Sequence, residues 1–343
     1  MELMMPSPRV LVLCGGRSEE HEVSLSSAKS VLAAAGERFE VTPLVIKKSG
    51  ELLSPESSRK ALLSGQSDIP LSSSQSLQSL DSSSFDVVFP LLHGPYGEDG
   101  TVQGFLKLMN LPFVGSDVLG SAVGMDKIMM KDVFKAYGLP QLPYLAIKRS
   151  DWLNRPDEVL NKVTALNYPI FIKPANLGSS VGISKAVDDM SLRSALDEAA
   201  RHDRRIIAEQ GIDSPRELEV AILGNDMPKA SPVGEISYRG DFYDYATKYT
   251  EGCARLDIPA QIPAELAEAI QTMGIEAFGA LDGAGLARVD FFYDEQTGSL
   301  YINEINTMPG FTTTSMYPKL WEAGGLSYSD LVAELIALGL ERR

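Results

Sequence analysis

Gly285-Leu-Ala-Arg-Val-Asp-Phe-Phe292 and Tyr301-Ile-Asn-Glu-Ile-Asn-Thr-Met-Pro-Gly310 carry the strongest structural signal in this chain of 343 residues. Both segments mix apolar and polar side chains, as strands do when one of their two faces is buried. Between them, Asp294-Glu-Gln-Thr-Gly298 has the composition of a turn. The sequence therefore predicts a β-hairpin with one packed face and one face that is available for chemistry.

The chemical face of this hairpin would carry one cation and three oxygen ligands. Arg288 and Asp290 should share a face of the first strand, and Glu304 and Asn306 a face of the second. A register with Asp290 next to Glu304 would gather two carboxylates and an amide oxygen. Mg²⁺ prefers such ligands, and ATP phosphates can complete its coordination. We therefore predict Asp290, Glu304 and Asn306 as metal ligands.

Length and composition limit the classes of protein. A chain of 343 residues predicts two or three α/β domains. The 31 Lys and Arg against 46 Asp and Glu give a net charge of −15, which disfavours nucleic acid and anionic membranes as partners. The two cysteines, Cys14 and Cys253, suggest neither a disulfide framework nor a metal site. No apolar run reaches about 18 residues and Met1 to Pro8 lacks a signal core, so we expect a cytoplasmic protein.

The N-terminal part begins with an apolar strand over residues 9–14, the turn Gly15-Gly16 and a helix over 24–35. This opening is weak evidence for nucleotide binding, because the full dinucleotide fingerprint is absent. Residues 39–46 and 85–92 should be further strands. The serine-rich segment 49–84 between them is expected to be mostly a surface connection with a short helix.

The rest of the chain alternates helices and strands. We expect helices over 101–109 and 121–137, with a domain boundary near Asp126. Further strands are predicted at 144–147, 169–173, 206–209, 217–223 and 233–237, and further helices at 156–165, 191–201, 264–278 and 328–340. The predicted fold class is α/β with an α+β central lobe, divided into domains 1–125, 126–215 and 216–343.

A Gly/Ser loop follows Lys173 in the segment Phe171-Ile-Lys-Pro-Ala-Asn-Leu-Gly-Ser-Ser-Val-Gly182. Glycines allow a backbone to approach phosphates closely, and serines such as Ser180 can donate hydrogen bonds. The Lys173 ammonium would add a point charge. This is not a Walker loop. Alone it is more often a plain turn, but together with the acidic hairpin it predicts phosphate binding.

The combined motifs resemble the D-alanine–D-alanine ligase family, in the order of that family and over nearly the whole chain. They are Gly15-Gly-Arg-Ser-Glu-Glu-His-Glu-Val-Ser24, His93-Gly-Pro-Tyr-Gly-Glu-Asp-Gly100, Met125-Asp-Lys127, the loop 173–182, Phe242-Tyr-Asp-Tyr-Ala-Thr-Lys-Tyr249, Ala287-Arg-Val-Asp290 and Asn303-Glu-Ile-Asn-Thr-Met-Pro-Gly-Phe-Thr312.

The resemblance implies a three-domain ATP-grasp enzyme with a Rossmann-like N-terminal domain. It would join two D-alanines for peptidoglycan synthesis. One carboxylate would attack the γ-phosphate of ATP to form an acyl phosphate, which the second amine would then attack, with release of ADP and phosphate. The implied cofactors are ATP and two Mg²⁺ ions, which Mn²⁺ can replace. A homodimer is also implied.

The same resemblance implies nucleotide contacts. Lys127 and Lys173 would hold the α and β phosphates, and Lys248 would reach the γ phosphate. Glu209 and Glu217 would bind the adenine amino group and the ribose hydroxyls. From the residues alone, Lys127 could equally be an ordinary helix-surface lysine and the two glutamates could be solvated strand residues.

Arg288 is the candidate for stabilising the oxyanion of the tetrahedral intermediate, with the backbone N–H of Gly310 as a second donor. The alternative is a structural salt bridge between Arg288 and Glu304. Only the oxyanion role would make Arg288→Lys damage turnover while the protein still folds, because lysine lacks the guanidinium fork.

By family position, Glu20 would bind the ammonium of the first D-alanine. Glu19 and Glu22 compete with it on sequence grounds, and an acidic residue here could simply be a helix N-terminal charge. Ser179 and Tyr249 would hydrogen-bond with Glu20 and close two loops over the substrates, which excludes water from the acyl phosphate. Tyrosine at position 249 predicts a dipeptide product rather than a depsipeptide.

Ser315 and the backbone N–H of Met316 would bind the carboxylate of the second D-alanine. His93 and Glu98 are predicted to line the substrate site, with His93 not acting as a base, since such a histidine is often a satisfied structural residue.

Three alternatives compete with this interpretation. Another ATP-grasp carboxylate–amine ligase would share the nucleotide site but differ around Glu20 and Tyr249. A non-catalytic nucleotide-binding regulator would be expected to have lost a metal ligand or Arg288, and none is lost. A nicotinamide dehydrogenase is disfavoured, because it would not use the acidic hairpin.

Overall fold

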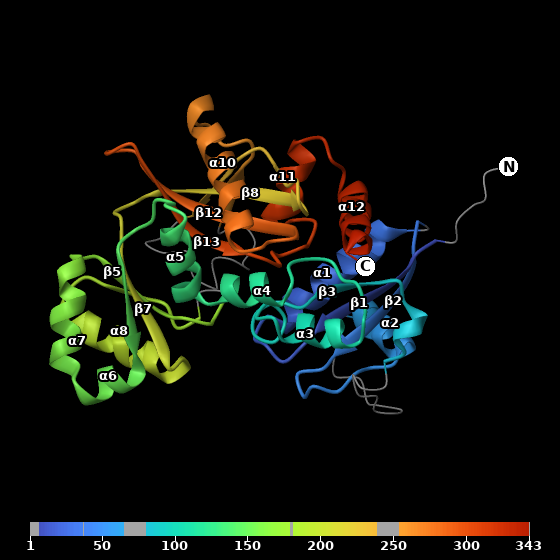
Figure 1. Ribbon diagram of the computed structural model, residues 1–343, viewed down its shortest axis with the longest axis horizontal. Coiled ribbons are helices and arrows are strands. Elements are labelled where there is room, and N and C mark those ends of the chain that lie inside the picture. Colours follow the sequence, from blue (N-terminus) through green and yellow to red (C-terminus); the bar gives the residue numbers. More distant parts are fainter. Residues whose placement is uncertain (1–6, 37, 65–79, 179–180, 239–253, 343) are drawn as a thin grey trace.

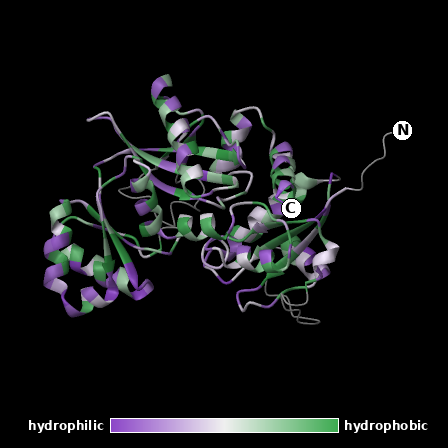
Figure 2. Ribbon diagram, viewed as in Figure 1, coloured by the Kyte–Doolittle hydropathy of each residue, from purple (hydrophilic) through white to green (hydrophobic). Residues whose placement is uncertain are grey.

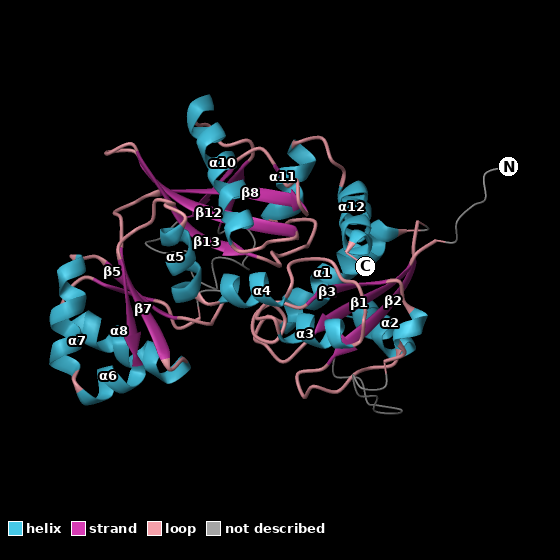
Figure 3. Cartoon of the chain, viewed as in Figure 1, coloured by secondary structure: helices cyan, strands magenta, loops and turns pink. Residues whose placement is uncertain are grey.

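Three β-sheets organise the chain, in a computed structural model that describes residues 7–36, 38–64, 80–178, 181–238 and 254–342. The sheets follow one another along the sequence and form three lobes, coloured blue, green to yellow, and orange to red in Figure 1. Helices cover each sheet, as Figure 3 shows. We propose that the three predicted domains, 1–125, 126–215 and 216–343, correspond to these lobes.

The N-terminal sheet is parallel, with strand order β2-β1-β3. Its strands are near-continuous apolar runs, which is typical of a parallel sheet covered on both faces. The elements are β1 (Arg9–Gly15), α1 (His21–Ala35), β2 (Glu40–Ile46), α2 (Pro55–Ser64), η2 (Ser82–Ser84), β3 (Val87–Leu91) and α3 (Thr101–Leu108). Gly15 at the end of β1 has φ +86°, and a Cβ there would lie 2.3 Å from the carbonyl oxygen of Ile46. Only glycine therefore fits this turn.

The central sheet is antiparallel, with order β4-β7-β5-β6. Its helices pack on one core together with buried residues of β5 and β7. The elements are β4 (Tyr144–Lys148), α6 (Arg149–Asn154), α7 (Pro156–Val163), η3 (Thr164–Leu166), β5 (Ile170–Pro174), β6 (Ser184–Ala186), α8 (Asp189–His202) and β7 (Arg205–Gln210). The α+β character that we predicted for this lobe is present.

The C-terminal sheet has the order β11-β10-β8-β12-β13, with β9 paired to β8. Its elements are β8 (Arg216–Gly224), β9 (Lys229–Ala230), β10 (Gly234–Tyr238), β11 (Ala254–Asp257), α10 (Ala264–Ala280), β12 (Gly285–Asp294), β13 (Ser299–Asn306), α11 (Met316–Ala323) and α12 (Tyr328–Glu341).

The two faces of the C-terminal sheet differ. One face is apolar along its length and packs under α10 through Leu218, Val220 and Val289. The other face is apolar only in part, where Leu223 and Leu286 join a core that also contains residues of α11, α12 and the N-terminal sheet. Figure 2 shows that these strands and helices carry both green, apolar segments and purple, polar ones. The C-terminal helices therefore complete the core of the N-terminal lobe.

The single helix predicted over 121–137 is wrong. The structure has two helices, α4 (Val118–Met125) and α5 (Lys127–Ala136), separated by Asp126. Asp126 has an extended backbone (φ −85°, ψ 102°), and its carboxylate accepts hydrogen bonds from the N–H groups of Ile128 and Met129. An aspartate that caps the second helix thus interrupts the first. The break makes Lys127 the first residue of α5.

The segment 49–84 contributes more to the core than a surface connection would. The predicted short helix exists as α2, but Leu52, Leu53, Ala61 and Leu62 are buried. Residues 65–79 lie outside the described part of the chain.

Among the described residues, no single helix is long and apolar enough to cross a membrane. α11 and α12 together pass by length and composition, but they are bent by 106° relative to each other, and Tyr317 and Leu331 from them are buried in the core.

Candidate active site

The predicted hairpin is present, and its register is the one that the metal hypothesis requires. β12 and β13 pair antiparallel with Asp290 opposite Glu304 and Arg288 opposite Asn306. Val289 and its partner Ile305 point into the core under α10. The polar side chains therefore share the opposite face, as alternation along both strands predicts.

A β-bulge in β13 adjusts this alternation. Asp290 pairs with Glu304 but Phe291 pairs with Ile302, so Asn303 is an extra residue in its strand. Strict alternation would place Ile302 on the same face as Glu304. The bulge lets both Ile302 and Ile305 reach the core while Glu304 stays on the polar face.

Arg288 lies between two carboxylates. Its Nε and Nη2 donate to Oδ1 and Oδ2 of Asp290, both at 2.7 Å, and its Nε is 3.0 Å from Oε2 of Glu219. Burial acts to lower the pKa of Arg288, but the charges of Asp290, Glu219 and Glu304 outweigh it and raise the pKa. The alternative role considered from the sequence was a salt bridge to Glu304, whereas the structure pairs Arg288 with Asp290 and Glu219.

The metal ligands that we predicted from the sequence fit a magnesium site. The side-chain amide of Asn306 donates from Nδ2 to Oδ2 of Asp290 at 3.1 Å, which leaves its Oδ1 as the atom for a cation. Glu304 lies directly across the strand pair from Asp290. Among the described residues no group of three or more His, Cys, Asp or Glu forms a metal cluster. Two carboxylates and one amide oxygen are, however, a set that Mg²⁺ accepts when phosphate oxygens complete it.

Lys127 lies beside this set rather than on a helix surface. Its Nζ donates to the carbonyl oxygen of Leu177 at 2.8 Å and is 3.7 Å from Oε2 of Glu304. Its backbone N–H donates to the carbonyl of Ala175 at 2.9 Å. The start of α5 is therefore fixed against the loop that follows β5. The Lys127 ammonium lies between that loop and the hairpin.

A buried ionic cluster connects β5, β7 and α5. Oε2 of Glu209 is 2.7 Å from Nζ of Lys173, and its Oε1 pairs with Nζ of Lys131. Lys131 and Glu209 are each 2% exposed. Burial acts to raise the pKa of Glu209, but the two lysines outweigh it and lower the pKa, whereas burial lowers the pKa of Lys131. We did not predict Lys131, although its position four residues after Lys127 places both on one helix face.

A cavity of about 430 Å³ separates the central and C-terminal sheets. Residues from both sheets line it, so these elements form opposite walls of one site. The walls include Phe171, Lys173, Glu209, Glu217, Glu219, Arg288, Asp290, Phe292 and Glu304. Of the nucleotide and metal residues that we predicted within the described chain, Lys127 and Asn306 do not line the cavity. Lys127 contacts Glu304, which lines it, and Asn306 contacts Asp290, which also lines it.

Glu20 and Glu98 meet at Gly94, beyond the end of β3. The backbone N–H of Gly94 donates to Oε1 of Glu98 at 2.7 Å. A Cβ on Gly94 would lie 2.8 Å from Oε2 of Glu20, and one on Gly178 would lie 3.2 Å from the same oxygen. Glu20 therefore faces the Gly/Ser loop. Its side chain does not cap α1, and Glu19 and Glu22 are exposed.

Burial, the largest cause, and the charge of Glu20 together raise the pKa of Glu98 to about 8. The hydrogen bond from Gly94 and the charges of Lys127 and Arg288 oppose this rise. Glu98 thus favours its protonated form at neutral pH, because its carboxyl is buried beside the negative charge of Glu20.

His93 connects the first sheet to the loop after β13. It is buried, its Nδ1 donates to the carbonyl of Met308 at 3.0 Å, and its Nε2 accepts from Oγ of Ser27 at 3.1 Å. Burial lowers the pKa of His93, against the charge of Glu20 and the hydrogen bond to Met308. Both ring nitrogens of a neutral imidazole are occupied, which fits a lining residue rather than a base.

Ser315 and Met316 lie at the start of α11, and Gly310 lies in the loop before it. Ser315 Oγ accepts from the N–H of Thr312 at 3.1 Å, and a Cβ on Gly310 would lie 3.1 Å from the same oxygen. Ser315 is the N-cap residue of α11, so the N–H of Met316 is among the first of a helix. Such N–H groups attract carboxylates. Four other candidates, Ser179, Ser180, Lys248 and Tyr249, lie outside the described residues.

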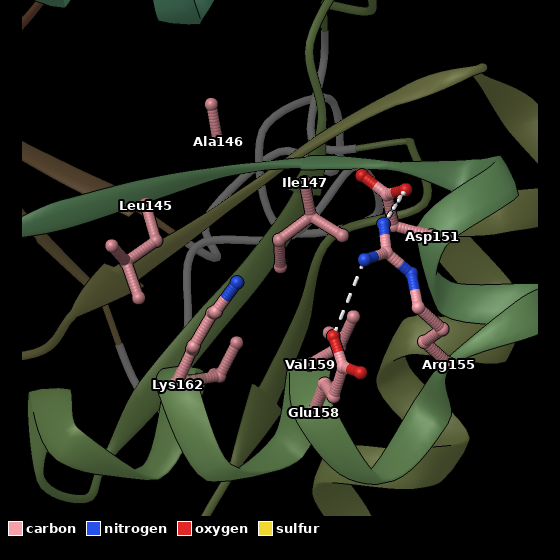
Figure 4. Close-up of a pocket in the computed structure, with 9 residues that line it drawn as sticks. Leu145, Ala146, Ile147, Asp151, Arg155, Glu158, Val159 and Lys162 are labelled. Carbon is pink, nitrogen blue, oxygen red and sulfur yellow. Dashed lines mark hydrogen bonds and ion pairs between the residues drawn. The ribbon is translucent and has the colours of Figure 1, made fainter.

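A smaller hollow of about 90 Å³ lies on the central lobe between β4 and the helices α6 and α7. Figure 4 shows Arg155 pairing with Asp151 and Glu158 at its edge. None of the site residues predicted from the sequence lines it.

Comparisons with known proteins agree with this geometry. The family models "D-ala D-ala ligase N-terminus" and "D-ala D-ala ligase C-terminus" match residues 9–116 and 133–337. A D-alanine–D-alanine ligase from Deinococcus radiodurans is 57% identical over 341 residues, which cover 98% of this chain and 99% of that protein.

Two solved structures are similar at 34% sequence identity. The D-alanine–D-alanine ligase from Coxiella burnetii has a TM-score of 0.82, with 98% of this chain and 95% of that chain covered. The VanG D-Ala:D-Ser ligase from Enterococcus faecalis has a TM-score of 0.84, with 97% and 99% covered. These neighbours confirm the ATP-grasp fold that the motifs predicted. By these family matches and by the identity over nearly its full length, the chain belongs to the D-alanine–D-alanine ligase family.

Proposed function

We propose that this protein joins two D-alanines into D-alanyl-D-alanine for peptidoglycan synthesis, with cleavage of ATP to ADP and phosphate. The observation that supports this most is the convergence of Arg288, Asp290 and Glu304 with Lys173 and Glu209 on one cavity between two sheets. Phosphoryl transfer depends mainly on positioning and charge neutralisation. The cavity offers cations and hard oxygen ligands for both.

Asp290, Glu304 and Asn306 would hold Mg²⁺, two ions by family resemblance, with Mn²⁺ as a substitute. When bound, the metal neutralises phosphate charge and orients the γ-phosphate for transfer. Lys127 and Lys173 would bind the α and β phosphates from two adjoining segments, the start of α5 and the end of β5. Lys248 would reach the γ-phosphate, with Ser180 as an additional donor.

Glu209 and Glu217 would contact the adenine amino group and the ribose. Glu217 lines the cavity on β8. Glu209 already pairs with two lysines, and each carboxylate oxygen has a second lone pair that can accept from a nucleotide. Both assignments agree with a nucleotide lying between the central and C-terminal sheets.

Glu20 would bind the ammonium of the first D-alanine, beside Glu98 and the loop at Gly178. The carboxylate of this substrate would attack the γ-phosphate, because a free carboxylate is a poor acyl donor and an acyl phosphate is a good one. Ser179 and Tyr249 would close over it and exclude water.

The second D-alanine would bind with its carboxylate at Ser315 and the N–H of Met316. Its amine would attack the acyl phosphate, the C–O bond to phosphate would break, and phosphate would leave. Arg288 and the N–H of Gly310 would stabilise the oxyanion of the tetrahedral intermediate. We also propose a cytoplasmic homodimer, in keeping with the resemblance.

Coupled ADP release with Mg²⁺ and D-alanine tests the proposal, together with the mass of the product. L-alanine is the control for stereochemistry, and D-serine is a control because one similar structure is a D-Ala:D-Ser ligase. We expect ADP release that depends on D-alanine and a product with the mass of the dipeptide. Folded protein without D-alanine-dependent ADP release would reject the proposal, and preferential use of D-serine would reject the assigned second substrate.

A further inference from the structure

Glu219 is a buried carboxylate that the roles above leave unused. It lies on β8, opposite Asp290 of β12 on one side and Gly234 of β10 on the other. Its side chain is 8% exposed, and its Oε2 is 3.0 Å from Nε of Arg288. A buried carboxylate is costly unless it is paired. The ion pair with Arg288 therefore offsets the cost of burying the Glu219 carboxylate.

Arg288 also pairs with Asp290, whose carboxylate accepts several hydrogen bonds. A carboxylate has about four lone-pair positions. Three hydrogen bonds from described residues reach the side chain of Asp290. Nε of Arg288 donates to Oδ1, and Nη2 of Arg288 and Nδ2 of Asn306 both donate to Oδ2. As a metal ligand, Asp290 must also give electron density to a cation. Its hold on Arg288 then weakens, because both cations compete for the same negative charge.

We propose that Glu219 is a positioning residue that keeps the guanidinium of Arg288 directed into the cavity when Asp290 is engaged by a metal. This inference rests on the proposed function, in which Arg288 acts on the oxyanion. Glu219 itself touches no reacting atom in this scheme. It acts through Arg288, from the neighbouring strand, where the backbone ladder between β8 and β12 fixes its distance from Arg288.

A double-mutant cycle without metal or nucleotide tests whether Glu219 and Asp290 share Arg288 as their partner. Glu219→Gln, Asp290→Asn and the double variant are unfolded in urea with EDTA. Each single variant should lose little stability, because the other carboxylate still pairs with Arg288. The double variant should lose about tenfold more in the unfolding equilibrium constant than the product of the single effects, as coupled neighbours do.

Glu235→Gln is the matched control for the cycle. Glu235 is a half-buried carboxylate of the same sheet that pairs with Arg216 through its Oε1 at 2.7 Å. Its effect should add to that of Asp290→Asn without coupling. Additive effects for Glu219→Gln as well would overturn the inference.

Steady-state kinetics separates positioning from a merely structural role. With Mg²⁺ saturating, Glu219→Gln should lower kcat by about 10- to 100-fold with the KM values for ATP and D-alanine unchanged, because a misdirected group costs rate rather than ground-state binding. In an Arg288→Lys background the same substitution should cost nothing further.

An effect of Glu219→Gln that disappears at saturating Mg²⁺ would show that Glu219 acts only by adding charge to the metal site, and would overturn the inference. Unchanged kcat would overturn it too. Absence of D-alanine-dependent turnover in the wild type would reject the proposed function instead, while the metal-free cycle still decides whether Glu219 and Asp290 share Arg288.

Discussion

Replacing Glu209 by glutamine removes the negative charge from the most buried ionic cluster near the cavity. Glu209→Gln keeps the shape of the side chain but leaves Lys131 and Lys173 as two buried cations without the carboxylate between them. The perturbation is therefore electrostatic, and we expect it to destabilise the central lobe more than any substitution of an exposed charge.

The magnitude follows from the distance. A pair of unit charges at the 2.7 Å that separates Nζ of Lys173 from Oε2 of Glu209 attracts by about 6 kcal/mol at an effective dielectric constant of about 20. Desolvation of both charges cancels part of this attraction, and breaking a buried pair typically costs about 3–5 kcal/mol. We expect a loss of about 4 kcal/mol for Glu209→Gln. Lys131→Met should cost less, about 1–3 kcal/mol, because Glu209 keeps Lys173.

Urea unfolding followed by tryptophan fluorescence measures this loss. Trp152 is buried in the core of the central lobe and Trp321 in the core that α11 joins. In a Trp321→Phe background the signal reports the lobe that contains Glu209. Glu56→Gln is the control, since Glu56 pairs with Lys60 on the exposed surface of α2, and its midpoint should not change. A Glu209→Gln protein within about 1 kcal/mol of its parent would refute the assignment of a stabilising cluster.

Glu98 should make stability depend on pH: its pKa is about 8 in the folded protein against 4.5 ordinarily, so its stabilising contribution is complete below pH 4.5 and is lost as pH rises through 8. Urea midpoints between pH 6 and 9 should fall more steeply for the wild type than for Glu98→Gln, and parallel curves would contradict the raised pKa. Arg288→Lys should lower kcat by about 10²- to 10³-fold while the circular dichroism spectrum stays that of the wild type, because lysine keeps the charge but not the fork. A normal kcat would leave the salt bridge as the whole role of Arg288. Ser315→Ala should raise the KM for the second D-alanine and leave the KM for ATP unchanged; equal changes in both would instead indicate a distortion of the loop that Ser315 fastens through Thr312.

The hairpin could be predicted from the sequence because its information is local. Alternation puts Arg288 and Asp290 on one face of the first strand and Glu304 and Asn306 on one face of the second, so the polar face followed from neighbouring residues alone. The pairing that starts at the turn, with Asp294 opposite Ser299, would put Asp290 opposite Asn303, and only the bulge brings Glu304 opposite Asp290. The bulge at Asn303 could not be foreseen in the same way. It depends on the demand of the core for both Ile302 and Ile305, which only the packed helix α10 imposes.

Contacts between distant segments account for most of what the sequence left unpredicted. Lys131 lies on the same helix face as Lys127, but its role depends on its ion pair with Glu209, which is distant in the sequence. Glu219 lies two residues after Glu217 and on the same face of β8, but only the pairing of β8 with β12 brings Glu219 next to Arg288. The break at Asp126 was missed because a capping aspartate inside an apolar helical pattern has the same local composition as a helix surface.

The same face of the C-terminal sheet serves both the core and the candidate site. Along β12, Leu286 packs in the core shared with the N-terminal lobe, and Arg288, two residues later on the same face, points into the cavity. β8 makes the same change between Ala221 and Glu219. The charges of the site thus begin where the apolar packing ends, in surroundings of low polarity. Electrostatic interactions are stronger there than at an open surface, so Arg288 and its carboxylates can be held rigidly before any substrate binds. The rigidity depends on α11 and α12, which cover the apolar half. We therefore expect that packing of the C-terminal helices supports the geometry of Arg288, although its ion pairs with Glu219 and Asp290 involve neither helix.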